Sequence, residues 1–253
     1  MKIAVTGASG FVGKNLVPAL EALGIDVVPV SHKDMPDAFE AVASDCDFVY
    51  YLAAVHRPLD DADFDAVNHQ LFRMFLKALR EANNPCPVVF TSSVQVELDN
   101  PYGQSKRSAE LALAEHCALA QSPGMVFRFP NLFGPHATPH SHSVVATFCY
   151  NVSRNLPLDV HDPAKYITLC YIADIVELLA AIPLHGNHLP GCHFHIIPDS
   201  LIYRVTLGDL AEAVQACSED LIPAPLGAVP ASFQRKLTST YRTYLPNGAP
   251  PSP

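Results

Sequence analysis

A glycine-rich loop between a strand and a helix at the start of the chain is the feature that most limits how it can fold. Residues 1–5 (MKIAV) form an apolar run, and residues 6–13 (TGASGFVG) follow with three glycines spaced three apart. A helical pattern begins directly after them. This junction predicts a parallel βαβ unit, because a strand and a helix pack this closely only where the turn lacks Cβ atoms.

The same alternation of strand and helix continues through the first half of the chain. Apolar runs predict strands over residues 27–30, 47–54, 87–93 and 125–134, and helical patterns separate them over residues 36–44, 63–82 and 105–120. Strands that are apolar throughout are typical of a parallel sheet covered on both faces. The short interval between residues 30 and 47 leaves little room for a further strand. The predicted fold class is α/β, a doubly wound parallel sheet of Rossmann type with a smaller C-terminal substrate-binding lobe.

The regular pattern weakens after about residue 134, which suggests where the chain divides. We predict a dinucleotide-binding domain mainly in residues 1–134 and a substrate-binding lobe in residues 135–246, some of whose elements return to the sheet. The proline-rich residues 247–253 are expected to form a tail. Within the lobe, Thr206 is placed to cap a helix over residues 206–217, with Asp209 three residues later.

Composition narrows the class of protein further. Apolar residues make up 49% and charged residues 16%, which is a globular profile, and the net charge is −9 without a lysine or arginine cluster. A nucleic-acid partner or an anionic membrane surface is therefore not expected. The seven cysteines include no CxxC pair, and no apolar run is long enough to span a membrane. These features predict a cytoplasmic protein with reduced thiols.

The position of the glycine loop favours a function beyond that of a turn. At the first strand–helix junction, glycines let the backbone approach a pyrophosphate, and the start of the helix supplies N–H donors. A tight turn that only packs the helix on the strand is the alternative. We expect the cofactor to contact six residues here, namely Gly7, Ser9, Gly10, Phe11, Val12 and Gly13.

The end of the second expected strand bears on the choice of cofactor. An acid at that position would hold a ribose hydroxyl and favour NAD(H), but the strand ends in Ser31, His32 and Lys33 before the first acid, Asp34. His32 and Lys33 are placed to meet a 2′-phosphate, so NADP(H) is favoured over NAD(H). The alternative is that Lys33 is only a solvated loop charge.

A serine, a tyrosine and a lysine follow the strand over residues 87–93. Ser93 ends that strand, where ligands gather in a doubly wound sheet, and Thr91 beside it is expected to line the cofactor site. Tyr102 and Lys106 are four residues apart, so they share one helix face. A lysine ammonium beside the phenol is expected to lower the tyrosine pKa, as a proton donor to a carbonyl requires. The pattern predicts carbonyl–alcohol redox chemistry with Ser93, Tyr102 and Lys106 as catalytic residues. We also expect Ser93 to hydrogen-bond the substrate oxygen and Lys106 to hydrogen-bond the nicotinamide ribose of the cofactor.

These motifs resemble those of the extended short-chain dehydrogenase/reductase superfamily. TGASGFVG is similar to its glycine loop, YGQSK (102–106) to its YxxxK, and FRFPNLFGP (127–135) to its RxxNxxGP segment. The resemblance implies that Leu52, Ala53 and Ala54 line the cofactor and that Asn131 touches a nucleotide sugar. It also matches YIADIVELL, around Asp174, to a later block of the superfamily.

Several longer segments, among them VHRPLDDADF, SVVATFCYNVSRN and LTSTYRTYLP, resemble the reductase domain of the CapF family of capsular-polysaccharide proteins. That resemblance implies reduction of the C4 ketone of a UDP-linked 2-acetamido-2,6-dideoxy-4-keto-hexose with NADPH. The family also carries a metal-binding cupin domain that epimerises the sugar, and this chain stops where that domain would begin. We therefore expect the epimerase to be a separate polypeptide or to have been lost. Members of the superfamily often dimerise, so a homodimer is expected.

Two further residues are candidates for contact with the substrate. Arg57 follows the third expected strand, and a structural salt bridge is an equally good interpretation of it; His142 lies in a polar loop near the expected substrate mouth. No metal site is predicted, although the histidines crowd two regions of the chain. Two other functions stay open: an epimerase of nucleotide sugars that holds NAD tightly, and a non-catalytic NADP-binding regulatory protein.

Overall fold

The computed structural model describes residues 1–56, 58–141, 143–186, 188–219 and 229–246. These residues form two compact units. The first contains Met1–Phe129 and Val176–Ile197, and the second contains Pro130–Ile175 and the chain from Pro198 onward. The segment Val176–Ile197 thus returns to the first unit, and it contains most of α7 (Ile172–Ala181) and all of β8 (Gly191–His195).

The first unit is built on a six-stranded sheet in which every neighbouring pair is parallel. Its strands run in the order β2 (Asp26–Val30), β1 (Lys2–Thr6), β3 (Phe48–Tyr51), β4 (Val88–Ser93), β5 (Pro123–Phe129) and β8. This arrangement confirms the predicted doubly wound α/β class. Both faces of the sheet are covered, which is why the central strands are apolar at nearly every position.

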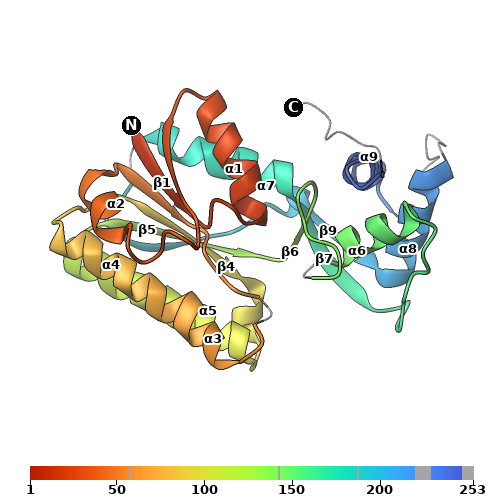
Figure 1. Cartoon of the computed structure of the whole chain (residues 1–253), viewed down its shortest axis with the longest axis horizontal. Helices are drawn as coiled ribbons and strands as arrows, with labels where there is room; N and C mark the ends of the chain where they lie inside the picture. Colours follow the sequence, from red (N-terminus) through yellow and green to blue (C-terminus); the bar gives the residue numbers. More distant parts are fainter. Residues whose placement is uncertain (57, 142, 187, 220–228, 247–253) are drawn as a thin grey trace. The chain divides into compact units, whose positions relative to one another are not determined.

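Helices cover the two faces of this sheet. α4 (Leu71–Glu81) and α5 (Pro101–Ala120) lie along one face, and α1 (Phe11–Ala22) and α7 lie along the other (Figure 1). Two neighbouring tyrosines of β3 show the alternation of faces along a strand. The Tyr51 ring packs against Phe72 of α4, with ring centroids 4.2 Å apart, whereas the Tyr50 hydroxyl donates to the carbonyl oxygen of Leu179 in α7.

The carboxyl ends of the strands bring together segments that are far apart in sequence. Thr6 at the end of β1 is level with Val30 of β2 on one side and Tyr51 of β3 on the other, and Ser93 of β4 is level with Phe129 of β5. The glycine loop, the segment after β3 and the segment after β4 therefore emerge at one edge. β1 is also the strand at which the order of the sheet reverses, the place where such folds bind ligands.

β2 is one of the two edge strands of this sheet, and β8 is the other. The chain between β2 and β3 contains turns and the helix α2 (Phe39–Asp45) but no strand, and all of residues 31–47 are described. The expectation that this interval is too short for a further strand is thus confirmed.

The second unit has its own small sheet and core. β6 (Asn131–Phe133) pairs in parallel with β7 (Tyr166–Tyr171), which pairs antiparallel with β9 (Ile202–Thr206). Three helices pack around a buried cluster in this unit: α6 (Val144–Val152), α8 (Leu207–Ala216) and α9 (Ala231–Arg242). Thr206 caps α8 as predicted, because its Oγ1 accepts from the Asp209 N–H at 3.0 Å.

Short elements complete the chain. They are α3 (Ala62–Asp65), the π-helical η1 (Ala66–Gln70) and the 3₁₀ turns η2 (Val94–Glu97), η3 (Ile182–His185), η4 (Asp199–Leu201) and η5 (Cys217–Glu219). Within the residues that the structure describes, none of the helices combines the length and the apolar character that crossing a membrane requires.

Candidate active site

The glycine loop is held tightly against the ends of two strands. Gly7 has a φ of +69°, a conformation that favours glycine, and its N–H donates to the carbonyl oxygen of Val30 at 2.8 Å. A Cβ at this position would lie 2.8 Å from the backbone nitrogen of Ala53, just after β3. Any other residue would therefore push apart the strand ends that the loop joins.

The helix that follows the loop begins with free backbone donors. Gly10 is the N-cap of α1, no acidic residue lies in the first turn, and a Cβ on the buried Gly13 would overlap the carbonyl oxygen of Gly7. The first N–H groups of a helix, here those of Phe11 and Val12, have no partner within the helix. A close glycine backbone and unpaired N–H groups at a positive helix end fit a pyrophosphate. Ser9 is exposed on the same loop.

The segment after β3 is fixed beside the loop by polar side chains. The buried Thr6 accepts through Oγ1 from the N–H groups of Leu52 and Ala53, at 3.2 and 3.4 Å. The buried Asn68 accepts from the Val55 N–H at 2.8 Å and returns a hydrogen bond to the carbonyl oxygen of the same residue at 3.0 Å. The predicted lining residues Leu52, Ala53 and Ala54 thus follow a strand end that is tied down on both sides.

At the β2 edge the side chains face solvent. His32 and Lys33 are both exposed in the turn after Val30. The Asp34 carboxylate accepts from the N–H and the hydroxyl of Ser31, at 2.8 and 2.6 Å. The hydroxyl bond, followed by the backbone bond, lowers the pKa of Asp34 below its usual value. The acid of this turn is therefore engaged locally, while His32 and Lys33 extend from it.

Ser93, Tyr102 and Lys106 lie where β4 meets α5, and all three are buried. Ser93 and Tyr102 are each 8% exposed and Lys106 is 2% exposed. The Tyr102 ring packs between His56 and Phe64, with ring centroids 5.2 and 5.8 Å away. The structure therefore brings the three predicted catalytic side chains to one strand–helix junction.

The lysine reaches back along the strand. Its Nζ donates to the carbonyl oxygen of Thr91 at 2.8 Å and lies 4.6 Å from the centre of the Phe90 ring. Burial lowers the pKa of Lys106 to about 7, against the carboxylate of Glu110, which raises it. The amine can therefore be charged or neutral near neutral pH.

The pKa of Tyr102 departs from the expectation based on sequence. Burial raises it to about 12, and hydrogen bonding with Ser93 lowers it by less. The lowering expected from a neighbouring ammonium is not found, because the Lys106 amine is directed to β4 and the phenol lies in an apolar packing site. A phenol with this pKa keeps its proton at neutral pH, as a proton donor must.

Two residues at the start of α5 set the position of Tyr102. The helix begins at Pro101, four residues earlier than predicted, and Asn100 caps it by accepting from the Gly103 N–H at 2.8 Å. A Cβ on Gly103 would overlap the backbone carbonyl of Gln95 in η2. The glycine next to Tyr102 thus allows the first turn of α5 to pack directly on the segment that follows Ser93.

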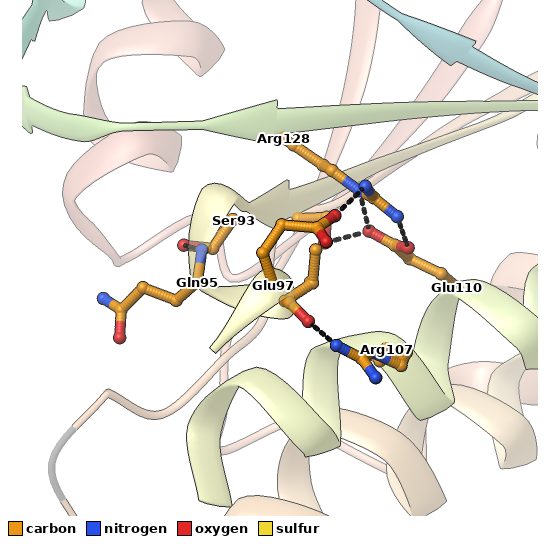
Figure 2. Close-up of polar contacts among 8 residues, drawn as sticks. Ser93, Gln95, Glu97, Arg107, Glu110 and Arg128 are labelled. Carbon is orange, nitrogen blue, oxygen red and sulfur yellow. Dashed lines mark hydrogen bonds and ion pairs between the residues drawn. The ribbon is translucent and has the colours of Figure 1, made fainter. Parts of the chain in front are cut away.

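An ion-pair network centred on the buried Glu110 supports this junction, and the sequence reasoning missed it. Glu110 of α5 accepts from the Ser92 hydroxyl and from Arg128 of β5, and Arg128 also reaches Glu97 at the end of η2 (Figure 2). Glu110 is four residues after Lys106, a spacing that places both on one helix face and was available as a signal. Nothing local in the sequence links Arg128 to either glutamate.

Besides Ser93, three residues were predicted to contact the substrate, and the structure describes one of them. Asn131 is exposed on β6 in the second unit, where its side-chain amide donates to the carbonyl oxygen of Thr168 at 3.5 Å. Arg57 and His142 lie outside the described residues. The roles of all three stay predictions.

Known proteins share both the sequence and the fold. Residues 3–196 match the model of the NAD dependent epimerase/dehydratase family. The chain is 35% identical over 247 residues to the UDP-2-acetamido-2,6-beta-L-arabino-hexul-4-ose reductase of Pseudomonas aeruginosa strain PA103. That match covers 97% of this chain and 65% of the reductase, so the chain spans about two thirds of its relative's length.

Solved structures show the same similarity in three dimensions. The capsular polysaccharide assembling protein CapF of Staphylococcus aureus superposes with a TM-score of 0.81 at 29% identity, over 100% of this chain and 67% of CapF. The UDP-glucose 4-epimerase of Thermus thermophilus, solved with NAD, gives a TM-score of 0.75 at 20% identity, over 96% of this chain and 99% of the epimerase. At this identity the similarity to the epimerase shows that the two proteins share a fold, and nothing about a shared activity.

Proposed function

The chain belongs to the NAD dependent epimerase/dehydratase family, and on that premise we propose that it is an NADPH-dependent reductase of a UDP-linked sugar. The substrate is a UDP-2-acetamido-2,6-dideoxy-4-keto-hexose, and the reaction reduces its C4 ketone. The observation that carries the proposal is the buried Ser93, Tyr102 and Lys106 cluster at the ends of β4 and α5, in a chain 35% identical to a reductase of such a sugar.

The chemistry divides between the cofactor and the side chains of the chain. The nicotinamide, when bound, supplies the hydride that the ketone carbon accepts. Ser93 donates a hydrogen bond to the ketone oxygen and orients it. Tyr102 transfers its phenolic proton to the same oxygen, so the ketone gains one hydride and one proton and becomes an alcohol. Lys106, one helical turn after Tyr102, would hydrogen-bond the nicotinamide ribose and so hold the cofactor beside the phenol.

The preference for NADPH rests on the β2 edge. His32 and Lys33 are exposed beside the glycine loop, and the nearest acid, Asp34, is held by Ser31. A 2′-phosphate at this edge would therefore meet two basic side chains. The resemblance to the CapF family extends the proposal to a homodimer in the cytoplasm, a role in surface-polysaccharide synthesis and a cupin-type epimerase that provides the keto-sugar.

The test is direct reduction of the keto-sugar. Purified protein is incubated with NADPH and a UDP-2-acetamido-2,6-dideoxy-4-keto-hexose, and loss of nicotinamide absorbance is followed together with the mass of the product. We expect a product heavier by two hydrogen atoms, and almost none from Tyr102→Phe. The matched control is Tyr50→Phe, which removes a hydroxyl from the same sheet, where it donates to the carbonyl oxygen of Leu179.

Two results would contradict the proposal. Full turnover by Tyr102→Phe would exclude Tyr102 as the proton donor. Protein that is purified with NAD bound, and that converts a UDP-sugar without added cofactor, would identify an epimerase instead.

A further inference from the structure

Glu110 is a carboxylate that the fold has enclosed. It is 3% exposed and lies in the middle of α5, facing the sheet. Its Oε1 accepts from the Ser92 hydroxyl at 2.6 Å and from Arg128 Nε at 2.9 Å, and its Oε2 accepts from Arg128 Nη2 at 2.7 Å. All three contacts are made to strands β4 and β5 rather than to its own helix.

The ion pair joins a buried carboxylate to a guanidinium whose side chain is 36% exposed, and removing the carboxylate from water offsets much of the attraction between them. An apolar pair would hold α5 to the sheet equally well. The position of Glu110 therefore points to a role that apolar residues cannot fill. It lies one helical turn after Lys106 and bonds the residue directly before Ser93.

The first consequence concerns geometry. Successive side chains of a strand point to opposite faces, so holding Ser92 determines the side on which Ser93 projects. Arg128 carries the constraint further, because its Nη1 donates to Glu97 at 2.7 Å, at the end of η2 (Figure 2). Ser93 caps that same turn, accepting from the Gln95 N–H at 3.2 Å. Glu110 thus holds the start of the segment 93–97 through Ser92 and its end through Arg128.

The second consequence concerns charge. Burial alone lowers the pKa of Lys106, and the carboxylate of Glu110 is the group that opposes it. The other groups that β4 presents to the Lys106 amine are uncharged, namely the Thr91 carbonyl and the Phe90 ring. Tyr102 lies on the same helix, with His56 against its ring.

Glu110 is itself faced by charged and titratable groups from three elements. Besides Lys106 on α5, these are Arg128 from β5 and Cys192 from β8, whose thiol pKa the carboxylate helps to raise. Among the residues that the structure describes, Arg128 is the group outside the helix that pairs an opposite charge with Glu110.

We propose that Glu110 is a positioning residue for the reductase reaction, which orients Ser93 through Ser92 and Arg128 and keeps the Lys106 amine charged. The inference rests on the proposed function. It predicts that the charge of Glu110 controls the pH at which Lys106 loses its proton. It also predicts that the length of the Glu110 side chain controls turnover.

The effect of the Glu110 charge on Lys106 is tested by measuring cofactor binding, which does not require turnover. The affinity for NADH is measured by nicotinamide fluorescence across a pH series, because NADH lacks the 2′-phosphate and so adds no titrating phosphate. Affinity for this anion is expected to fall as the pH rises through the pKa of Lys106. In Glu110→Gln the midpoint of that fall moves to lower pH by about one unit, since a neutral amide no longer favours the ammonium.

The matched control is Glu115→Gln, the same substitution on an exposed glutamate of α5. Its midpoint is expected to equal that of the wild type. His56, Tyr102 and Cys192 are present in all three proteins, so a difference between them reports Glu110. A Glu110→Gln midpoint equal to the control would overturn the electrostatic role.

Glu110→Asp tests whether the length of the Glu110 side chain matters. It is also the variant that tests the proposal if Glu110→Gln does not fold. Aspartate keeps the negative charge, but its side chain is shorter by one methylene, so the carboxylate lies farther from Ser92. Its midpoint is expected within a few tenths of a unit of the wild type, whereas kcat for the keto-sugar falls about tenfold with KM little changed. Wild-type kcat in this variant would overturn the geometric role.

The outcomes separate the two proposals. If the wild type does not reduce the keto-sugar, the proposed function fails, and the pH series still decides the link between Glu110 and Lys106. If the wild type is active and neither variant departs from its control, the inference on Glu110 fails alone.

Discussion

The junction of β4 with α5 and the edge at β2 are both expected to contact one cofactor, yet they are built in opposite ways. At the junction Ser93, Tyr102 and Lys106 are buried, and a network through Glu110 and Arg128 supports them. At the edge His32 and Lys33 are exposed, and the Ser31 and Asp34 side chains of their turn hydrogen-bond within residues 31–34.

The difference follows from what each region has to do. Proton transfer requires a phenol, an amine and a hydroxyl at fixed distances, and burial strengthens the electrostatic effects among them. Recognition of a phosphate by basic side chains tolerates water and movement, and each surface contact contributes little. The junction should therefore respond strongly to small changes, and the edge weakly to large ones.

The largest effect is expected from removing the phenolic proton at the junction. Tyr102→Phe should lower kcat by about 10²–10⁴-fold, because general acid catalysis contributes about that much. The affinity for NADPH should stay within a few-fold, measured by nicotinamide fluorescence. A variant that loses cofactor binding instead would show that Tyr102 is mainly part of the binding surface.

Lys106→Met should separate stability from function at the same junction. The pKa of this lysine falls from 10.5 to about 7 on burial, so between these values the unfolded chain binds a proton that the folded chain does not. Stability therefore rises with pH across that window, and the penalty is fully present below about pH 7. The variant should be inactive but more stable by about 2–4 kcal/mol at pH 6, with little gain near pH 10.

The measurement is the melting temperature of both proteins across pH. Lys77→Met is the control, because Lys77 is 63% exposed and pairs with Glu81 on the surface. A gain in Lys106→Met that does not depend on pH would mean that apolar packing, not loss of the charge, stabilises it.

Gly103→Ala should show how closely the junction is packed. The new Cβ would overlap the Gln95 carbonyl, so η2 has to move. We expect a loss of about 1–3 kcal/mol in the free energy of unfolding, measured by denaturant titration, together with reduced kcat. Gly24→Asn is the comparison, since Gly24 has a φ of +75° but no atom within 4 Å of its Cβ position, and asparagine tolerates that conformation. Equal effects at both glycines would contradict the packing argument.

The smallest effect is expected at the β2 edge. Lys33→Glu should reduce the preference for NADPH over NADH by about two- to fivefold and leave kcat unchanged, because an exposed pair is worth about 1 kcal/mol or less. The two affinities are compared by fluorescence titration, with Lys77→Glu as the charge control on α4. An unchanged preference would support the alternative that Lys33 is only a solvated loop charge.

The same two regions show how far sequence reasoning reached. The glycine loop, the β2 edge and the YxxxK pair were predicted, because each depends on residues that are close along the chain. The doubly wound sheet was also predicted, since strand–helix alternation has few topological solutions. The start of α5 was placed four residues late, because Asn100 and Pro101 act as a cap and a first residue only once η2 packs beside them.

The electrostatics of the junction could not be predicted in the same way. A tyrosine and a lysine one helical turn apart suggested a lowered phenol pKa, whereas burial raises it to about 12. Desolvation depends on every chain segment that surrounds the group, here His56 and Phe64 from the region after β3.

The sequence by itself determined the alternation of strands and helices in the first half of the chain, the glycine loop and the chemical identity of the reactive side chains, because these depend on local spacing and on residue type. Only the tertiary structure decided that Arg128 of β5 meets Glu110 of α5 and Glu97 of η2, and that Lys106 is buried. Contacts between distant segments, and the burial that shifts pKa values, arise when the sheet assembles, so no local pattern contains them.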